Sequence, residues 1–362
     1  MAFIVSFIVL LLIHCSSAAA SAFVNESKVA GVRIVPAVIA FGDSIIDPGN
    51  NNDIDGTLIK SNFAPYGVDF PNHISTGRFS NGRVVGDIIA SRLGVKEYLP
   101  KYVNNDLEPE ELLTGVSFAS GGTGFDPMTP KLQNVFSMDD QIGFFHDYVD
   151  KLYTIAEEDR VRDMIAKSLF LVCVGNDDIS NTYYGSPFRF LEYDIDSYVD
   201  FMIENAVQFV EKLVSNGARR IGFVGLPPVG CLPSQRTLAG GFFRKCDSKR
   251  NKAAQLYNSR ISRALEKIKN RHPGLKVLFM SIYDQMMDII DNPDKYGFEE
   301  TKKGCCGSGL IEVTLLCSRV VTTELCDDTS KYMFWDSFHP TERGYHAIMD
   351  DMLDRHIHDL DN

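Results

Sequence analysis

A serine near one end of the chain and an aspartate–histidine pair near the other could form the catalytic set of a serine hydrolase. Ser44 lies in a Gly-Asp-Ser motif directly after an apolar run, and Asp336 and His339 are three residues apart in the motif Asp-Ser-Phe-His-Pro. A serine hydroxyl becomes nucleophilic when an imidazole removes its proton, and a carboxylate must orient that imidazole. Because a triad is defined by geometry and not by adjacency in sequence, the long separation of Ser44 from the pair is no obstacle.

Attack on an ester carbonyl would also require hydrogen-bond donors for the negative charge that develops on the carbonyl oxygen. The expected donors are the backbone N–H of Ser44, a backbone N–H of Gly121 or Gly122, and the side-chain amide of Asn176. Glycine suits this role, since a backbone without Cβ can approach a substrate closely. Both glycines stay candidates.

The elements that must position these residues are five apolar, β-branched runs that predict buried strands. The runs cover residues 35–41, 115–119, 169–174, 220–226 and 275–281. Amphipathic helices are predicted at 198–214 and 249–268, and Ser80 is expected to cap a helix that contains Val84. This alternation predicts an α/β fold: a three-layer α/β/α sandwich around a five-stranded, mostly parallel, flavodoxin-like sheet of order 2-1-3-4-5.

The candidate residues follow these strands in a consistent way. Ser44 follows the first predicted strand, the glycine-rich segment follows the second, and Asn176 follows the third. The carboxyl ends of parallel strands meet at one edge, where ligands bind in open α/β sheets. The Asp–His motif lies on a loop ahead of the last helix, and Pro340 suits the first turn of that helix. We therefore expect the polar residues to converge on one edge of the sheet.

Four blocks of the chain resemble the plant GDSL esterase/lipases of the SGNH hydrolase superfamily, and among them the extracellular-lipase type. They are residues 41–51, 115–124, 174–177 and 336–340, and residues 77–83 and 225–231 look like further segments of that family. The resemblance runs from about residue 35 to about residue 356. It implies the same three-layer sandwich, with Asn176 and one of the two glycines as oxyanion residues. It also extends the serine block to Asp47, Asn50 and Asn51, which we expect to hold the Ser44 loop in shape and not to react.

The N-terminus is predicted to be a secretory signal peptide over residues 1–22. An apolar stretch at residues 3–13 is followed by small residues that offer cleavage after Ala20 or Ala22. A membrane anchor is less favoured, because the stretch is well short of the ~20 apolar residues that a span needs. A short arm, residues 23–34, would precede a single hydrolase domain over residues 35–362, and Asn25 is a candidate glycosylation site. We expect a secreted, extracellular protein without a transmembrane segment.

Cysteine usage agrees with an oxidising compartment. An even set of cysteines in loop-like sequence predicts three disulfides among Cys231, Cys246, Cys305, Cys306, Cys317 and Cys326. Cys231 and Cys246 are the natural local pair, and the other four would staple the 305–326 loop with a connectivity left open. Zinc is the rival interpretation, but no histidine is interleaved and the adjacent Cys305 and Cys306 lack C-x-x-C spacing. Cys173 lies within a predicted strand and is expected to be free.

Composition and missing motifs exclude several other classes of protein. The net charge of −12 argues against nucleic-acid binding, which needs a basic surface. The chain has no G-x-S-x-G nucleophile elbow, no G-x-x-x-x-G-K-[ST] phosphate loop and no H-E-x-x-H zinc motif. We therefore expect no cofactor and no metal.

The function that these residues predict is a secreted serine esterase or lipase that hydrolyses carboxylic esters, small or lipid, through an acyl-enzyme on Ser44. One alternative is an acyltransferase with the same triad, in which an alcohol replaces water. The other is a catalytically silent lipid- or glycan-binding protein, against which the intact set of residues argues. The sequence does not indicate the acyl and alcohol portions of the substrate or the oligomeric state of the protein.

Overall fold

The core of the protein is a sheet of four parallel strands, seen in a computed structural model that describes residues 34–322 and 324–356. The signal-peptide and glycosylation predictions, which include Ala20, Ala22 and Asn25, lie outside the described residues. The strands pair in the order β1-β2-β3-β4. Their bounds are β1 Val38–Gly42, β2 Leu169–Cys173, β3 Arg220–Val224 and β4 Lys276–Met280. Every residue of β1 and β2 is buried, as expected for strands covered on both faces.

The second of the five predicted strands, residues 115–119, takes its expected place beside β1 but is not a regular strand. Its backbone exchanges hydrogen bonds with Ala40, from Ala40 N–H to Val116 O (3.0 Å) and from Phe118 N–H to Ala40 O (2.8 Å), and forms only isolated bridges. On its outer edge, Ser117 forms a bridge with the backbone of Lys101, and the Asn50 side chain donates to the carbonyls of Ser117 and Ala119. The five-stranded prediction is therefore corrected to four strands plus one bridged segment, in the predicted spatial order.

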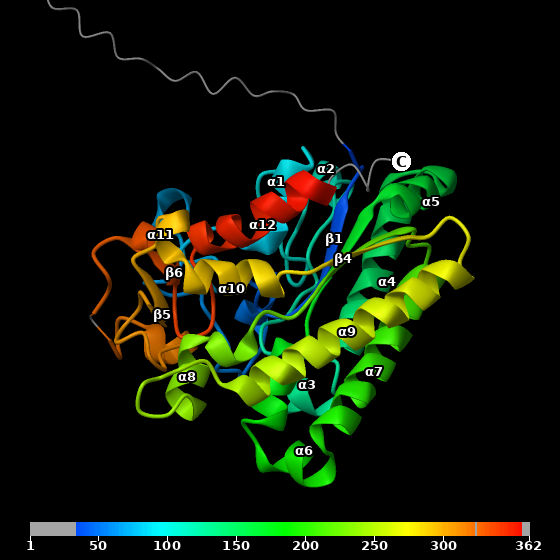
Figure 1. Ribbon diagram of the computed structural model, residues 1–362. Helices are drawn as coiled ribbons and strands as arrows, with labels where there is room; N and C mark the ends of the chain where they lie inside the picture. Colours follow the sequence, from blue (N-terminus) through cyan, green and yellow to red (C-terminus); the bar gives the residue numbers. More distant parts are fainter. Residues whose placement is uncertain (1–33, 323, 357–362) are drawn as a thin grey trace, which may run out of the picture. The chain divides into compact units, whose positions relative to one another are not determined.

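Helices cover both faces of the sheet and complete the three-layer α/β/α sandwich that the sequence predicts (Figure 1). One face carries α4 Met138–Ile155, α5 Glu158–Lys167, α7 Ile195–Ser215 and α9 Ser248–Arg271. The other carries α1 Val85–Arg92, α10 Tyr283–Asp291 and α12 Glu342–His356. The remaining helices are short: α2 Pro109–Leu112, α3 Met128–Gln133, α6 Pro187–Glu192, α8 Pro233–Ala239 and α11 Pro293–Tyr296.

Local sequence explains where the long helices begin. The side chains of Ser137, Asp194 and Asp247 each accept a hydrogen bond from the first turn of α4, α7 and α9. The two predicted long helices are present as α7 and α9. Ser80 is not the cap that we expected, because α1 begins only at Val85 and the Ser80 hydroxyl instead donates to the Pro340 carbonyl. This contact joins the start of α1 to the loop of the Asp–His motif.

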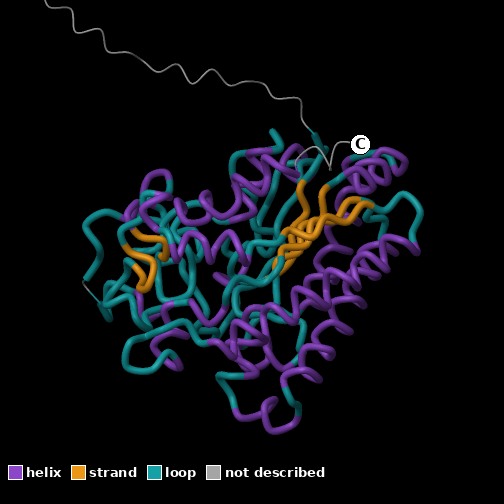
Figure 2. Tube along the Cα trace, in the orientation of Figure 1, coloured by secondary structure: helices purple, strands orange, loops and turns teal. Residues whose placement is uncertain are grey.

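A second, smaller sheet lies apart from the main one and was not predicted (Figure 2). It pairs β5 Glu300–Gly304 in parallel with β6 Tyr332–Phe334. A separate apolar cluster adjoins the ends of its strands and is built from Tyr66, Trp335 and three half-cystines. The structure forms three disulfides: Cys231–Cys246, Cys305–Cys326 and Cys306–Cys317. Cys173 is buried and free.

None of the helices in the described part of the chain combines the length and apolar character needed to cross a membrane.

Peptide mapping of the mature, non-reduced protein is expected to recover these three cross-links and a single alkylated thiol at Cys173. The physical basis is that the paired cysteines are held together by the fold, whereas Cys173 is buried in the sheet beside no other cysteine sulfur among the described residues. A Cys305–Cys306 link, or six free thiols, would contradict the structure.

Candidate active site

Ser44, His339 and Asp336 lie in a continuous hydrogen-bonded row. The Ser44 Oγ is 2.8 Å from His339 Nε2, and His339 Nδ1 is 2.8 Å from Asp336 Oδ2. A carboxylate only accepts, so His339 Nδ1 carries the proton and donates it to Asp336, which leaves Nε2 to accept from the serine hydroxyl. All three side chains are at least 96% buried. This is the arrangement that makes a serine a nucleophile.

The end of β1 delivers Ser44 to this place. Gly42 lies so close to the end of β2 that a Cβ on it would be 1.9 Å from the Cys173 carbonyl oxygen. The Gln141 side chain bonds both the N–H and the carbonyl of Gly42, and the next N–H, of Asp43, donates to Cys173 (3.0 Å). The chain therefore leaves the sheet at a fixed point, with Ser44 in the turn that follows.

The Asp–His loop orients its own residues. Asp336 Oδ1 accepts hydrogen bonds from the backbone N–H groups of Phe338 (2.8 Å) and His339 (2.7 Å). The rings of Phe79 and Phe338 lie next to the imidazole, with centroid distances of 5.2 Å and 5.4 Å. The three-residue spacing thus allows one tight turn to present both the acid and the base.

The two glycines that the sequence could not separate have different environments. The Gly121 N–H donates to Asp47 Oδ2 (3.0 Å), and a Cβ on Gly121 would be 2.6 Å from the Phe79 ring. Gly122 lines the same cavity as Ser44 and His339, and its N–H bonds to no other residue in the described ranges. The geometry therefore favours Gly122 as the donor that faces a substrate, with Gly121 as its support.

Asn176 lies beyond the end of β2 and is 3% exposed. Its side-chain amide makes no hydrogen bond to another described residue, and its buried Oδ1 is unpaired. Asn176 does not line the cavity of Ser44. It lines a smaller neighbouring one, of about 40 Å³, together with Asp43 and Phe338. Phe338 borders both cavities, so the two lie next to each other.

Comparison with known proteins shows the family of this chain. Residues 38–352 match the family described as GDSL-like lipase/acylhydrolase. The chain belongs to this family. It is 48% identical to the GDSL esterase/lipase EXL3 of Arabidopsis thaliana over 324 residues, which cover 90% of this chain and 88% of the relative. It is 46% identical to the GDSL esterase/lipases At1g20120 and At5g42170 of the same plant, over 86% and 89% of this chain and 77% and 86% of those relatives.

The extended serine block of this GDSL chain ties the loops of the site together. The Asp47 carboxylate accepts from the N–H groups of Gly49 (2.7 Å), Asn50 (2.7 Å) and Gly121. The Asn51 amide donates to the Gly121 carbonyl (2.8 Å). Asn50 joins the 115–119 segment to the backbone N–H groups of residues 102 and 103. The three side chains make contacts of the kind that a supporting role requires.

Buried acids surround the site of this GDSL hydrolase, and sequence reasoning missed two of them. Burial and the nearby Asp177 raise the pKa of Asp43 well above its usual value. Burial also raises the pKa of Asp177 to about 6, although the neighbouring His339 acts in the opposite direction. Asp177 lines the cavity of Ser44, and its Oδ2 is buried without a partner among the described residues. Both acids stand within motifs that the sequence shows, Gly-Asp-Ser and Asn-Asp, but the sequence did not reveal that they are buried.

A third missed residue is Tyr66, whose hydroxyl donates to Asp336 Oδ2 at 2.7 Å. No motif in the sequence connects it to the Asp–His loop, since the two residues are 270 positions apart.

Within residues 34–322 and 324–356, no group of three or more His, Cys, Asp or Glu side chains is arranged to hold a metal ion.

Asp47→Asn is expected to flatten the pH dependence of the free energy of unfolding between about pH 4 and pH 6. Burial raises the pKa of Asp47 from 3.8 to about 6, despite its backbone N–H partners. In this window the folded chain therefore binds more protons than the unfolded chain, and the parent loses stability as the pH rises. Asparagine does not titrate, so this part of the slope should vanish. Urea unfolding at pH 4, 5, 6 and 7 measures it.

The matched control is Asp55→Asn, which changes an exposed aspartate in the same loop. Its slope should equal that of the parent. An Asp47→Asn protein with the parent's slope would show that Asp47 does not hold its proton in the folded chain.

Proposed function

We propose that this chain is a secreted serine esterase or lipase that hydrolyses carboxylic esters through an acyl-enzyme on Ser44. The observation that carries the proposal is the row of short hydrogen bonds from Ser44 through His339 to Asp336. Membership of the GDSL lipase/acylhydrolase family supports the esterase chemistry. The disulfides and the predicted signal peptide support secretion.

In the first half of the reaction, His339 Nε2 takes the Ser44 proton as Oγ bonds to the carbonyl carbon. The resulting imidazolium is stabilised by the Asp336 carboxylate. The negative charge on the carbonyl oxygen would be met by the N–H groups of Ser44 and Gly122 and by the Asn176 amide. As the C–O bond to the alcohol breaks, His339 returns the proton to the leaving oxygen.

In the second half, water replaces the alcohol. His339 removes a proton from water as its oxygen bonds to the acyl carbon, and then returns that proton to Ser44 Oγ as the acid leaves. Asp336 remains ionised throughout. The enzyme regains its starting state, and one ester and one water become one alcohol and one acid.

The cavity above the triad supports an ester with an apolar portion. Its volume is about 510 Å³. The apolar side chains on its wall are Ile59, Phe79, Leu238, Ile311, Val313 and Phe338. Leu238 is 70% exposed and Ile311 is 49% exposed, so apolar surface continues from the cavity to the outside. Such a surface favours the hydrocarbon part of a lipid or long-chain ester over a fully polar one.

Ser44→Ala is expected to lower kcat for p-nitrophenyl butyrate by roughly 10⁴-fold or more, because the covalent step loses its nucleophile. The fold should be unchanged, and labelling by a fluorophosphonate probe should be lost. The control is Ser215→Ala, at an exposed position at the end of α7. This variant should keep both the kcat and the fluorophosphonate labelling of the parent.

Product analysis completes the test. Free acid should be the main product when glycerol is added in excess. A Ser44→Ala protein that turns over ester like the parent would remove Ser44 as the nucleophile. An acyl-glycerol as the main product of the parent would make the chain an acyltransferase.

A further inference from the structure

The Tyr66 side chain has contacts that go beyond filling space. It is 1% exposed, and its hydroxyl oxygen accepts a hydrogen bond from the Thr314 N–H at 2.8 Å. A backbone N–H only donates, so the hydroxyl proton of Tyr66 is directed to its other neighbour, Asp336 Oδ2, at 2.7 Å. Burial and the charge of Asp336 raise the pKa of Tyr66 well above its usual value. The phenol therefore stays protonated and remains a donor.

Asp336 is fully buried and depends on its donors. Its Oδ1 is bonded by the backbone N–H groups of Phe338 and His339, within its own loop. Its Oδ2 receives only two hydrogen bonds from described residues, one from the His339 ring and one from Tyr66. When an oxygen of a buried carboxylate loses a hydrogen-bond donor, the folded state loses free energy of stabilisation, and the carboxylate reorients. Tyr66 is thus the donor from outside the loop that fixes the orientation of the carboxylate plane.

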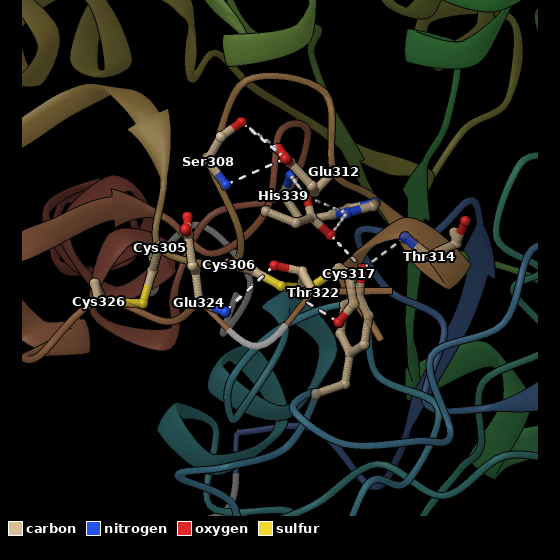
Figure 3. Close-up of a disulfide and its surroundings, with 12 residues drawn as sticks. Cys305, Cys306, Ser308, Glu312, Thr314, Cys317, Thr322, Glu324, Cys326 and His339 are labelled. Carbon is tan, nitrogen blue, oxygen red and sulfur yellow. Dashed lines mark hydrogen bonds and ion pairs between the residues drawn. A yellow bond between two sulfur atoms is a disulfide. The ribbon is translucent and has the colours of Figure 1, made fainter. Parts of the chain in front are cut away.

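A disulfide core in turn fixes Tyr66. The Tyr66 ring lies 6.0 Å from that of Trp335, between centroids, in the second apolar cluster, to which Cys306 and Cys317 also belong. Thr314, which binds the Tyr66 hydroxyl, lies in the segment that the Cys306–Cys317 disulfide closes. Figure 3 shows Thr314, His339 and this disulfide gathered in one region.

We propose that Tyr66 is a positioning residue of the triad, and that the Cys306–Cys317 disulfide acts on the catalytic aspartate through the path Thr314, Tyr66, Asp336. The proposal rests on the function proposed above and extends it: a cross-link outside the triad sets the geometry of the carboxylate that orients the catalytic base. The same closed segment also accepts a hydrogen bond from the Ser337 N–H to the Glu312 carbonyl (2.8 Å), so it contacts the Asp–His loop at a second point.

The first test is Tyr66→Phe, which removes the hydroxyl and keeps the ring in its cluster. We expect kcat for p-nitrophenyl butyrate to fall about tenfold, the effect of one hydrogen bond to a charged group, with KM changed less than about twofold. The rate of fluorophosphonate labelling at Ser44 should fall by a similar factor. This second readout reports the reactivity of Ser44 without any ester substrate.

The matched control is Tyr198→Phe. Tyr198 is also fully buried, and its hydroxyl also donates to a buried carboxylate, Asp126 (3.0 Å), but outside the triad. This variant should keep the kcat and the labelling rate of the parent. Circular dichroism and thermal unfolding would verify that both variants are folded. If Tyr66→Phe matches the parent in kcat and labelling rate, or if both variants lose the same activity, the proposal is wrong.

The second test is a double-mutant cycle between the hydroxyl and the disulfide. Replacing Cys306 and Cys317 by serine should lower kcat by up to about tenfold in the parent and by less than about twofold in Tyr66→Phe, because the two changes break one path. Replacing Cys231 and Cys246 by serine is the control, and its cost should be equal in both backgrounds. Equal costs of the Cys306–Cys317 change in both backgrounds would overturn the proposed path.

These outcomes separate the inference from the proposed function. A parent whose ester turnover survives Ser44→Ala would refute the proposed function. A parent that depends on Ser44 but not on Tyr66 would refute the inference alone.

Discussion

The constraint on which the site depends is the burial of the Asp336 carboxylate. A charge without access to water is tolerated only when its oxygens are hydrogen-bonded. Asp336 meets this requirement with two N–H groups of its own turn, the His339 ring and the Tyr66 hydroxyl. One of these donors, Tyr66, belongs to the small apolar cluster that contains the half-cystines Cys305, Cys306 and Cys317. Within that cluster Tyr66 is 1% exposed, and its hydroxyl donates to an acid 270 positions away.

A second constraint acts at the serine. The turn after β1 must place Ser44 next to a histidine 295 positions later, so neither partner can move far. Close contact of Gly42 with β2 fixes one end of this turn. Asp47 fixes the other by holding the N–H groups of Gly49, Asn50 and Gly121. The Gly121 N–H is bonded to Asp47, whereas Gly122 lines the cavity and its N–H bonds to no other described residue. One carboxylate thus accounts for the bonded state of Gly121.

Sequence reasoning worked where the signal was local. The apolar runs that became β1 to β4, the long helices α7 and α9, and the sequence spacing of Cys231 and Cys246 can all be read from short windows. The residue types of the row Ser44, His339 and Asp336 could be chosen for the same reason, because each stands in a compact motif. The burial that raises the pKa of Asp43 and Asp177 could not be predicted, since it depends on packing from several elements.

Sequence reasoning failed where long-range pairing decides. Tyr66 stands in no motif for acid–base chemistry and becomes relevant only through contacts with Thr314 and Asp336. Ser80 has the residue type of a helix cap, but a hydrogen bond to the loop before α12 takes its hydroxyl. Residues 115–119 have the composition of a strand, yet they form only isolated bridges, and the Asn50 side chain bonds two of their carbonyls.

The central claim is that Ser44 attacks the ester and that Gly122 and Asn176 donate hydrogen bonds to the negatively charged oxygen. A crystal structure of the phosphonylated protein tests this claim most directly. A fluorophosphonate adduct resembles the tetrahedral intermediate. The account predicts phosphorus bonded to Ser44 Oγ, with the phosphonyl oxygen about 3 Å from the N–H groups of Ser44 and Gly122 and from the Asn176 amide. The Gly121 N–H should still be bonded to Asp47. Phosphorus on another residue, or an oxygen directed away from both Gly122 and Asn176, would contradict the account.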